Sequence, residues 1–205
     1  MQAEPVTLEG RLVRLEPLSL RHHEALCAVA LEPELWRWTW GAVRTPEDLR
    51  RYIDTALLEQ VAGTALPFAI VHRGEARPIG STRYGNIALA HRRLEIGWSW
   101  VGRAYQGTGV NAEAKLLLLG HAFERLECQR VEFKTDALNA QSCDALNKLG
   151  ATFEGIFRKH GVADGGRVRD TAWYSITDEE WPAVRTGLER RPLRIALRQE
   201  QRPAA

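Results

Sequence analysis

Cysteine is scarce in this chain of 205 residues, which contains only Cys27, Cys128 and Cys143. The three form no Cys-x-x-Cys pair, and no cluster of cysteines and histidines has the spacing of a metal site. The sequence therefore predicts neither a bound metal nor a disulfide framework. Reduced thiols of this kind are typical of a cytoplasmic protein.

A long apolar run and a strong net charge are also missing. No apolar stretch approaches the roughly 18 residues that span a bilayer, and the N-terminus has no basic and apolar leader. We therefore expect a cytoplasmic protein without a membrane partner. The formal net charge of +2 does not indicate nucleic-acid binding. We interpret the arginines near the C-terminus as a solvated helix face or a loose tail. They are Arg185, Arg190, Arg191, Arg194, Arg198 and Arg202.

What is present is the composition of an ordinary globular domain, with 44% hydrophobic and 26% charged residues. No internal repeat, low-complexity segment or linker interrupts the chain, and its length is sufficient for one sizeable core. We expect a single domain over residues 1–205, with its core in residues 11–176 and a C-terminal helix and tail in residues 177–205. From Ala196 onward we expect a frayed end.

The first half of the chain predicts one strand, two helices and then three strands. Capping residues and prolines mark the ends of these elements. The three later strands are joined by short turns, so they must pair antiparallel. The predicted elements are a strand at 11–17, a helix between Ser19 and Pro33, a helix at 46–63, and strands at 67–72, 79–88 and 93–101.

The second half alternates helix and strand. Apolar residues over most of its circumference predict a buried helix that follows Gly109 and continues to about Phe123. We therefore expect an α/β (α+β) fold with a mixed central sheet of about six to seven strands, an antiparallel N-terminal part and flanking helices. The remaining predicted elements are a strand at 131–137, a short helix to Gly150, a hairpin of strands at 153–157 and 169–176, and a helix at 178–188.

A glycine turn within residues 103–114 leads from the last antiparallel strand into the buried helix. Gly107 and Gly109 lack a Cβ atom, so the chain can bend sharply there and point successive backbone amides toward one place. At the start of a helix these amides have no intrahelical partner and carry the positive end of the helix dipole, so they suit an anionic group. The turn therefore predicts a phosphate cradle. A plain strand-to-helix connection is the alternative.

The same turn fits a second pattern. Gly107, Gly109 and Ala112 satisfy the Gly-x-Gly-x-x-Gly/Ala motif of dinucleotide-binding folds. Such a fold places the motif after the first strand of a parallel sheet. Because the three preceding strands are predicted to be antiparallel, the order of elements argues against a dinucleotide-binding protein.

Three segments, in the expected order, resemble the GNAT superfamily of acetyl-CoA-dependent N-acetyltransferases. Residues 106–111 resemble the family's Gln/Arg-x-x-Gly-x-Gly/Ala cradle, with Asn111 where a small residue is usual. Residues 94–101 resemble the family strand whose splayed backbone binds the pantetheine arm of the cofactor. Residues 139–151 resemble an Asn-x-x-Ser/Ala segment that ends in Lys-x-Gly-Phe/Ala. The likeness covers almost the whole chain and points to the RimJ/RimL-like branch, the ribosomal-protein N-terminal acetyltransferases.

The resemblance implies acetyl-CoA as co-substrate, splayed central strands and no metal. A pantetheine arm is a chain of amides, so the unpaired backbone groups of a splayed strand can bond to it, and the pyrophosphate caps the helix that follows. The residues that would bind acetyl-CoA are Ser99, Val101, Gln106, Gly107, Thr108, Gly109, Val110, Asn111 and Asn139.

Two catalytic roles are implied by the same resemblance. Glu95 matches the position of a catalytic glutamate in some members, so it is the candidate general base, acting directly or through water. An exposed strand carboxylate is the alternative. Leu146 replaces the tyrosine that commonly protonates the leaving thiolate. Ser142 resembles the serine proposed for that task in the RimJ/RimL-like branch, and a helix cap is its alternative. Tyr105 and Tyr174 are the other candidate donors.

The wall that binds the amine acceptor is predicted in the connection between the first two helices. Trp36, Trp38 and Trp40 face one side if this connection is extended, and they would line a pocket or a peptide groove. Core packing and a homodimer interface are the alternatives. The residues of the final hairpin that would line the same cleft are Arg158, His160 and Arg169.

We therefore expect an N-acetyltransferase that moves acetyl from acetyl-CoA to a primary amine by direct transfer in a ternary complex. The acceptor is either a protein N-terminus or a small-molecule amine, and the balanced charge does not discriminate between them. An α-amino group with a pKa of about 8 needs less help from a base than a lysine with a pKa of about 10.4. Two other functions stay open at this point: a non-catalytic acyl-CoA-binding or sensing module, and a dinucleotide-binding oxidoreductase.

Overall fold

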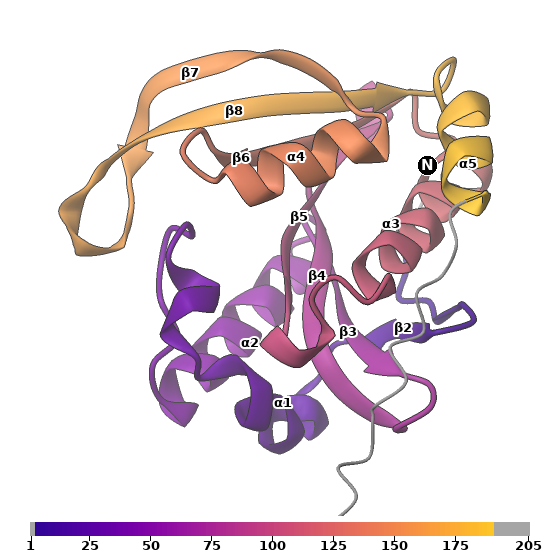
Figure 1. Ribbon diagram of the computed structural model, residues 1–205. Helices are drawn as coiled ribbons and strands as arrows, with labels where there is room; N and C mark the ends of the chain where they lie inside the picture. The colour runs from indigo at the N-terminus through magenta and orange to yellow at the C-terminus, as the bar shows by residue number, and fades with distance from the viewer. Residues whose placement is uncertain (1–2, 191–205) are drawn as a thin grey trace, which may run out of the picture.

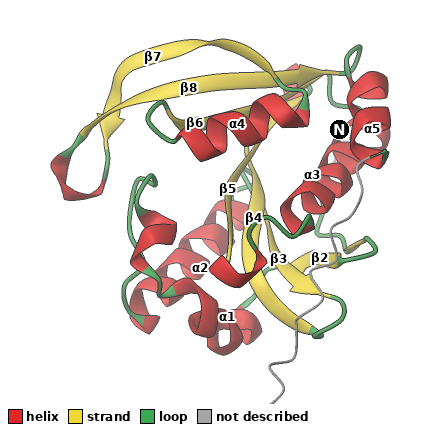
Figure 2. Ribbon diagram, viewed as in Figure 1, coloured by secondary structure: helices red, strands yellow, loops and turns green. Residues whose placement is uncertain are grey.

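The computed structural model describes residues 3–190, so the frayed end expected from Ala196 lies outside the described residues. One mixed sheet of eight strands runs through the molecule in the order β1-β2-β3-β4-β5-β6-β8-β7 (Figures 1 and 2). Its strands are β1 (Leu8–Glu9), β2 (Val13–Pro17), β3 (Leu66–His72), β4 (Arg77–Ala88), β5 (Arg93–Val101), β6 (Arg130–Asp136), β7 (Thr152–Val162) and β8 (Val168–Thr177). The α-helices are α1 (His23–Ala30), α2 (Pro46–Val61), α3 (Val110–Gly120), α4 (Ala140–Leu149) and α5 (Trp181–Glu189).

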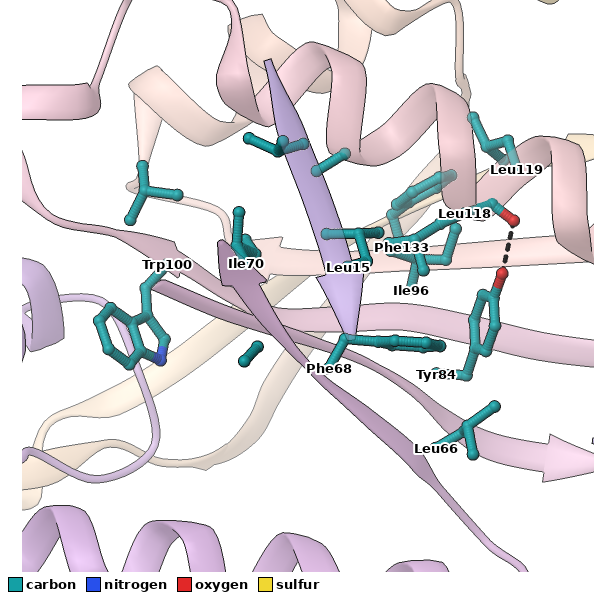
Figure 3. Packing of buried hydrophobic residues seen from close by; sticks show 14 of the residues in the cluster. Leu15, Leu66, Phe68, Ile70, Tyr84, Ile96, Trp100, Leu118, Leu119 and Phe133 are labelled. Carbon is teal, nitrogen blue, oxygen red and sulfur yellow. Dashed lines mark hydrogen bonds between the residues drawn. The ribbon is translucent and has the colours of Figure 1, made fainter. Parts of the chain in front are cut away.

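Helices cover both faces of the N-terminal half of the sheet. α1 packs against β4 and α2 against β3, while α3 packs against β1, β2 and α5. The close view in Figure 3 shows part of the buried core, in which residues of the sheet, such as Phe68 and Tyr84, pack together with Leu118 of α3. Tyr84 of β4 is fully buried among them, and its hydroxyl donates to the carbonyl of Leu118 on α3 at 2.6 Å. In the described part of the chain, no helix is long and apolar enough to cross a membrane.

The predicted α/β fold and its antiparallel N-terminal part are confirmed. β2, β3, β4 and β5 pair antiparallel in sequence order. The glycine turn therefore follows the fourth strand of an antiparallel series. A dinucleotide-binding fold needs this turn after the first strand of a parallel sheet, so that alternative is wrong.

The sheet has one strand more than predicted, because the first strand begins at Val13 and a short strand, β1, precedes it. The turn between β1 and β2 is held from outside the hairpin by Glu113 of α3. Its carboxylate accepts hydrogen bonds from the backbone amides of Arg11, Leu12 and Val13 at 2.8, 2.7 and 2.8 Å. These hydrogen bonds hold Arg11 and Leu12 in the turn, and β2 begins at Val13.

The final hairpin is longer than predicted. β7 does not end at Phe157 but continues to Val162, past a register shift between Phe157 and Gly161. Gly155 has a φ of 147°, and Lys159 lies in the left-handed region with a φ of 50°. Such irregularities bend a strand without ending its pairing. β7 and β8 therefore form a long curved arm that extends beyond the rest of the sheet (Figure 1).

The splayed central strands are confirmed. β5 and β6 pair in parallel through three residue pairs only, Arg93 with Arg130, Leu94 with Val131 and Glu95 with Glu132. Beyond Glu95, β5 stays paired to β4 as far as Val101, and β6 stays paired to β8 as far as Asp136. The two halves of the sheet therefore diverge, and the facing edges of β5 and β6 have no strand between them.

We predict that replacing Glu113 with alanine destabilises the protein by about 3 kcal/mol, since three backbone amides lose a charged hydrogen-bond acceptor. Chemical denaturation followed by circular dichroism measures this loss. Glu24→Ala, which removes an exposed carboxylate from α1, is the matched control and should change stability by less than about 0.5 kcal/mol. Equal effects of the two substitutions would show that the carboxylate of Glu113 does not hold the β1–β2 turn.

Candidate active site

β5 is irregular just beyond the point where it leaves β6. Two residues of β5, Trp98 and Ser99, lie opposite the single residue Thr82 of β4. Trp98 has a left-handed backbone with a φ of 50°, which a bulky residue rarely adopts. A β-bulge of this kind turns the local backbone away from a regular ladder. The strand edge that faces the opening is thus distorted as well as unpaired.

The glycine turn follows β5 and ends at the start of α3. Gly107 and Gly109 have φ values of 75° and 95°, a region in which glycine is not strained. The hydroxyl of Thr108 donates to the carbonyl of Tyr105 at 2.7 Å and tightens the turn. A Cβ atom on Gly107 would meet no other atom within 4 Å, so there is open space beside the turn. Open space next to the first amides of a helix suits an anionic group.

The other predicted cradle residues surround this turn. Gln106 donates from Nε2 to the carbonyl of Val101 at 3.5 Å, which links the turn to the end of β5. Val110 is buried as the first residue of α3, and Asn111 is exposed. The unpaired edge of β5 and the open cradle are therefore contiguous. This arrangement fits the two parts of acetyl-CoA, an amide-containing arm and a pyrophosphate.

Glu95 lies at the point where the strands part, and it is buried. Its residue is 5% exposed, so the alternative of an exposed strand carboxylate is wrong. Oε2 of Glu95 lies 2.7 Å from Nζ of Lys134 on β6, and it accepts a hydrogen bond from Nδ2 of Asn86 at 2.6 Å. A Cβ atom on Gly97 would lie 2.9 Å from Oε1. The carboxylate is therefore held between β4, β5 and β6.

A second buried charge carrier, Lys115 of α3, lies near the same point. Its Nζ lies 2.5 Å from Oγ of Ser99, which in turn lies 2.7 Å from Oγ1 of Thr82. Burial lowers the pKa of Lys115 to about 7, and the negative charge of Glu95 opposes that shift. This lysine could not be predicted from the sequence, because it lies in a leucine-rich helix most of whose buried residues are apolar.

Asn139 and Ser142 meet at the start of α4. Oδ1 of Asn139 accepts a hydrogen bond from the backbone amide of Ser142 at 3.1 Å. Asn139 is therefore the capping residue of this helix, and the alternative of Ser142 as the cap is wrong. Ser142 is half-buried in the first turn of the helix.

The two tyrosines considered as proton donors are engaged elsewhere. The hydroxyl of Tyr105 donates to Glu75 at 2.7 Å and accepts from Arg77 at 2.5 Å, near the β3–β4 turn. Burial and a hydrogen bond to Cys143 raise the pKa of Tyr174 to about 12. Neither arrangement favours proton transfer near neutral pH.

The three tryptophans do not share one face, because their segment is not extended. Residues 33–36 form a 3-10 helix, and turns follow it. Trp36 is buried, donates from Nε1 to the carbonyl of Ala30 at 2.7 Å and packs against Trp100. Trp38 is half-buried, while Trp40 is 44% exposed. Trp36 thus lies in the core, and the other two rings lie nearer the surface.

The final hairpin packs against this tryptophan segment. The ring of Trp40 has the guanidinium of Arg169 4.0 Å from its centroid and lies edge-on to His160 at 5.9 Å. A Cβ atom on Gly161 would lie 2.6 Å from the Trp40 ring, so glycine permits this close packing. Arg169 also donates to the carbonyl of Trp38 at 3.3 Å. Arg158 of the same hairpin is exposed.

Lys134 joins this aromatic group to Glu95. Its Nζ lies 4.1 Å from the centroid of Trp173, which stacks on Phe157 and lies edge-on to His160. The same Nζ pairs with Glu95. A continuous series of contacts therefore runs from the aromatic rings of the hairpin, through Lys134, to the carboxylate. The roles of Lys134 and Trp173 could not be predicted from the sequence. The alternation of residues places each on a strand but does not show which strands are neighbours in the sheet. Among residues 3–190, no group of three or more His, Cys, Asp or Glu side chains has the geometry of a metal site.

Comparison with known proteins identifies the family. Residues 12–152 match the acetyltransferase (GNAT) domain family. An uncharacterized N-acetyltransferase p20 from Bacillus licheniformis is 28% identical over 85% of this chain and 98% of its own length. The ribosomal-protein-serine acetyltransferase of Escherichia coli is 26% identical over 57% of this chain and 64% of its own length.

Solved structures agree with these relatives. A putative acetyltransferase from T. thermophilus is 38% identical, with a TM-score of 0.83 over 92% of this chain and 98% of that chain. Mycobacterium smegmatis RimJ, solved in complex with CoA-disulfide, is 25% identical, with a TM-score of 0.78 over 90% of this chain and 94% of that chain. The domain match, these likenesses and the diverging strands together establish that this chain belongs to the GNAT family of N-acetyltransferases, in its RimJ/RimL-like branch.

Proposed function

We propose that this chain binds acetyl-CoA between β5 and β6 and transfers its acetyl group directly to the α-amino group of a protein N-terminus. The observation that carries the donor assignment is the three-pair ladder between β5 and β6, followed by an unpaired strand edge and an open glycine turn. Unpaired backbone groups bind the pantetheine amides, and the first amides of α3 bind the pyrophosphate. The residues assigned to the donor are Ser99, Val101, Gln106, Gly107, Thr108, Gly109, Val110, Asn111 and Asn139.

Glu95 is the proposed general base. Its Oε2 is held by Lys134 and Asn86, and this pairing fixes the carboxylate where the strands part. Its Oε1 lies beside the backbone of Gly97, where β5 begins to face the opening. From there Oε1 receives the proton of the acceptor amine, directly or through one water molecule. Ser142 is retained as one candidate donor to the leaving sulfur.

The acceptor wall is formed by the tryptophan segment and the β7–β8 arm. Trp38, Trp40 and His160 line it, and Trp36 supports it from the core through its packing on Trp100. Aromatic rings supply a large rigid contact area for an extended peptide. An α-amino group is partly neutral near pH 7, so it needs less assistance from a base than a lysine side chain. The name of the Escherichia coli relative also supports a protein acceptor.

Gly107→Ala should weaken acetyl-CoA binding at least tenfold, because alanine in the left-handed region strains the cradle and shifts its amides. Isothermal titration calorimetry measures this affinity. Gly63→Ala is a matched control, since Gly63 has a φ of 72° and equally open space around its Cβ position but follows α2. Both variants should lose similar stability, and only the first should lose affinity. Absence of acetyl-CoA binding to folded wild-type protein would refute the donor assignment.

Glu95→Gln should lower turnover by about 100-fold and leave acetyl-CoA affinity unchanged, since it removes a base and keeps the shape of the side chain. Gly97→Ala should act in the same direction, because its Cβ atom would displace Oε1 of Glu95. Gly187→Ala, on the exposed side of α5, is the control, because its Cβ atom would meet nothing within 4 Å. Steady-state thiol release over a pH series measures each effect. Full activity of Glu95→Gln at every pH would remove the base assignment.

Transfer to the acceptor can be tested with three synthetic amines. We expect acetylation of a peptide with a free N-terminus, and much slower acetylation of an N-terminally blocked peptide that carries lysine and of a polyamine. Mass spectrometry locates the added acetyl group. Preference for the lysine peptide or the polyamine would contradict the protein N-terminus as acceptor and would leave the acetyl-CoA site standing.

A further inference from the structure

Lys115 is a buried lysine that the transfer reaction described above does not use. It is 8% exposed, and the hydrogen bond from its Nζ to Ser99 Oγ measures 2.5 Å. A charged lysine is rarely buried in this way without a carboxylate in direct contact. Burial lowers its pKa to about 7, so near neutral pH this amine exists in both protonation states.

The position of Lys115 connects the cradle with the opening. An α-helix rises about 1.5 Å per residue, so Lys115 lies between one and two turns beyond Val110, where α3 starts. Ser99 belongs to the bulge of β5, in the part of the strand that has no β6 partner, and its residue is exposed. A single hydrogen bond therefore joins a buried amine to a hydroxyl at the edge of the opening.

The charged groups around Lys115 allow its amine to gain and lose a proton. Glu95 on β5 raises the pKa of Lys115, and Lys134 on β6 pairs with Glu95 and partly neutralises it. From β4, the Thr82 hydroxyl approaches Ser99. On α3 itself, Glu113 is directed to the backbone of the β1–β2 turn. On α5, which also packs on α3, the ionic groups pair with one another and with the segment after α3, namely Arg185 with Glu124 and Glu189.

We propose that Ser99 donates the proton that the leaving sulfur needs, and that Lys115 acts through Ser99 as the positioning residue that replaces this proton. This proposal rests on the proposed acetyl transfer and completes it. It fills the role left open by Leu146, which stands where the family resemblance implies a tyrosine. Ser99 is exposed on the unpaired part of β5, whereas Lys115 is buried behind it.

The proton balance of the transfer closes without a further reactant. A bond forms between the acceptor nitrogen and the acyl carbon, and the carbon–sulfur bond breaks with its electron pair on sulfur. The acceptor nitrogen loses one proton to Glu95. Ser99 Oγ gives one proton to sulfur and receives one from Lys115 Nζ. Proton exchange with solvent then returns Glu95 and Lys115 to their starting states.

A purely structural role for Lys115 makes a different prediction. A lysine that only ties α3 to β5 would matter for stability and cofactor affinity, and its removal would leave the pH profile of turnover unchanged. The relay instead requires Lys115 to lose and regain a proton near neutral pH. Measurements of protonation and of the pH profile therefore separate the two roles.

The protonation of Lys115 can be measured without any reaction. The chain contains four lysines, Lys115, Lys134, Lys148 and Lys159, so NMR titration of ¹³C-labelled lysine gives few signals, and Lys115→Met assigns one of them. We expect this signal to titrate near pH 7. Titration above pH 9.5 would overturn the proposal.

The pKa of Lys115 also makes the stability of the protein depend on pH. Its pKa in the folded state is below that of a free lysine, so the unfolded chain binds more protons between about pH 7 and 10.4. The stability of the wild-type protein relative to Lys115→Met should therefore rise with pH over that window.

Kinetics at saturating acetyl-CoA test the relay itself. Ser99→Ala and Lys115→Met should each lower kcat by about 100-fold. Acetyl-CoA affinity by calorimetry should change little, because Ser99→Ala keeps the backbone groups that are assigned to the pantetheine arm. The double variant should be no slower than the slower single variant, because both act in one relay. Lys115→Arg keeps the positive charge but cannot give up its proton near neutral pH, so it should lower kcat about as much as Lys115→Met does. Arg50→Met, which removes an exposed basic side chain from α2, is the control and should keep wild-type kinetics.

The outcomes separate this proposal from the proposed function. If the wild-type protein transfers acetyl, an unchanged pH profile of kcat in Lys115→Met overturns the relay. A lower kcat in Ser142→Ala together with a wild-type kcat in Ser99→Ala also overturns it. If the folded wild-type protein binds acetyl-CoA but acetylates no amine, the proposed transfer fails and the relay fails with it. A 100-fold loss of kcat in each single variant, with no further loss in the double variant, supports the relay.

Discussion

The architecture of the site depends on the short parallel ladder between β5 and β6. Three residue pairs join the halves of the sheet, and the last of them contains Glu95. Each strand then continues with its other neighbour, so two long ladders diverge from one junction. Extending the β5–β6 ladder would satisfy more backbone groups but would close the opening. The bulge at Trp98 and Ser99 turns β5 away from a regular ladder at this point.

Buried and half-buried polar groups gather at that junction. Glu95, Lys134 and Lys115 come from β5, β6 and α3, and each has a polar neighbour within hydrogen-bond distance. Buried charges are costly unless they are paired, and breaking one pair leaves the other charge without a partner. Such a network therefore fixes the relative positions of two strands and a helix. It also places groups that gain or lose protons next to the proposed acetyl site, which links fold stability to chemistry.

Local sequence patterns were sufficient to predict most of the fold and the glycine turn before α3. The turn at Gly107 and Gly109 depends on neighbouring residues, and antiparallel pairing follows from short connections. The contacts that complete the site could not be read in this way, because they join residues far apart in the chain. Glu113 binds amides about one hundred positions away, and Lys115 meets Ser99 only after α3 has packed on the sheet. The bend of the tryptophan segment, which sends Trp36 into the core, likewise depends on tertiary packing.

Amide hydrogen exchange with and without acetyl-CoA tests the central claim most directly, since that claim assigns the donor to the unpaired edge of β5 and the adjoining turn. The account predicts slower exchange on acetyl-CoA addition for the amides of residues 98–101 and 106–111, with little change in β2 and β3. Tight binding that leaves both segments unprotected and slows exchange elsewhere would contradict it.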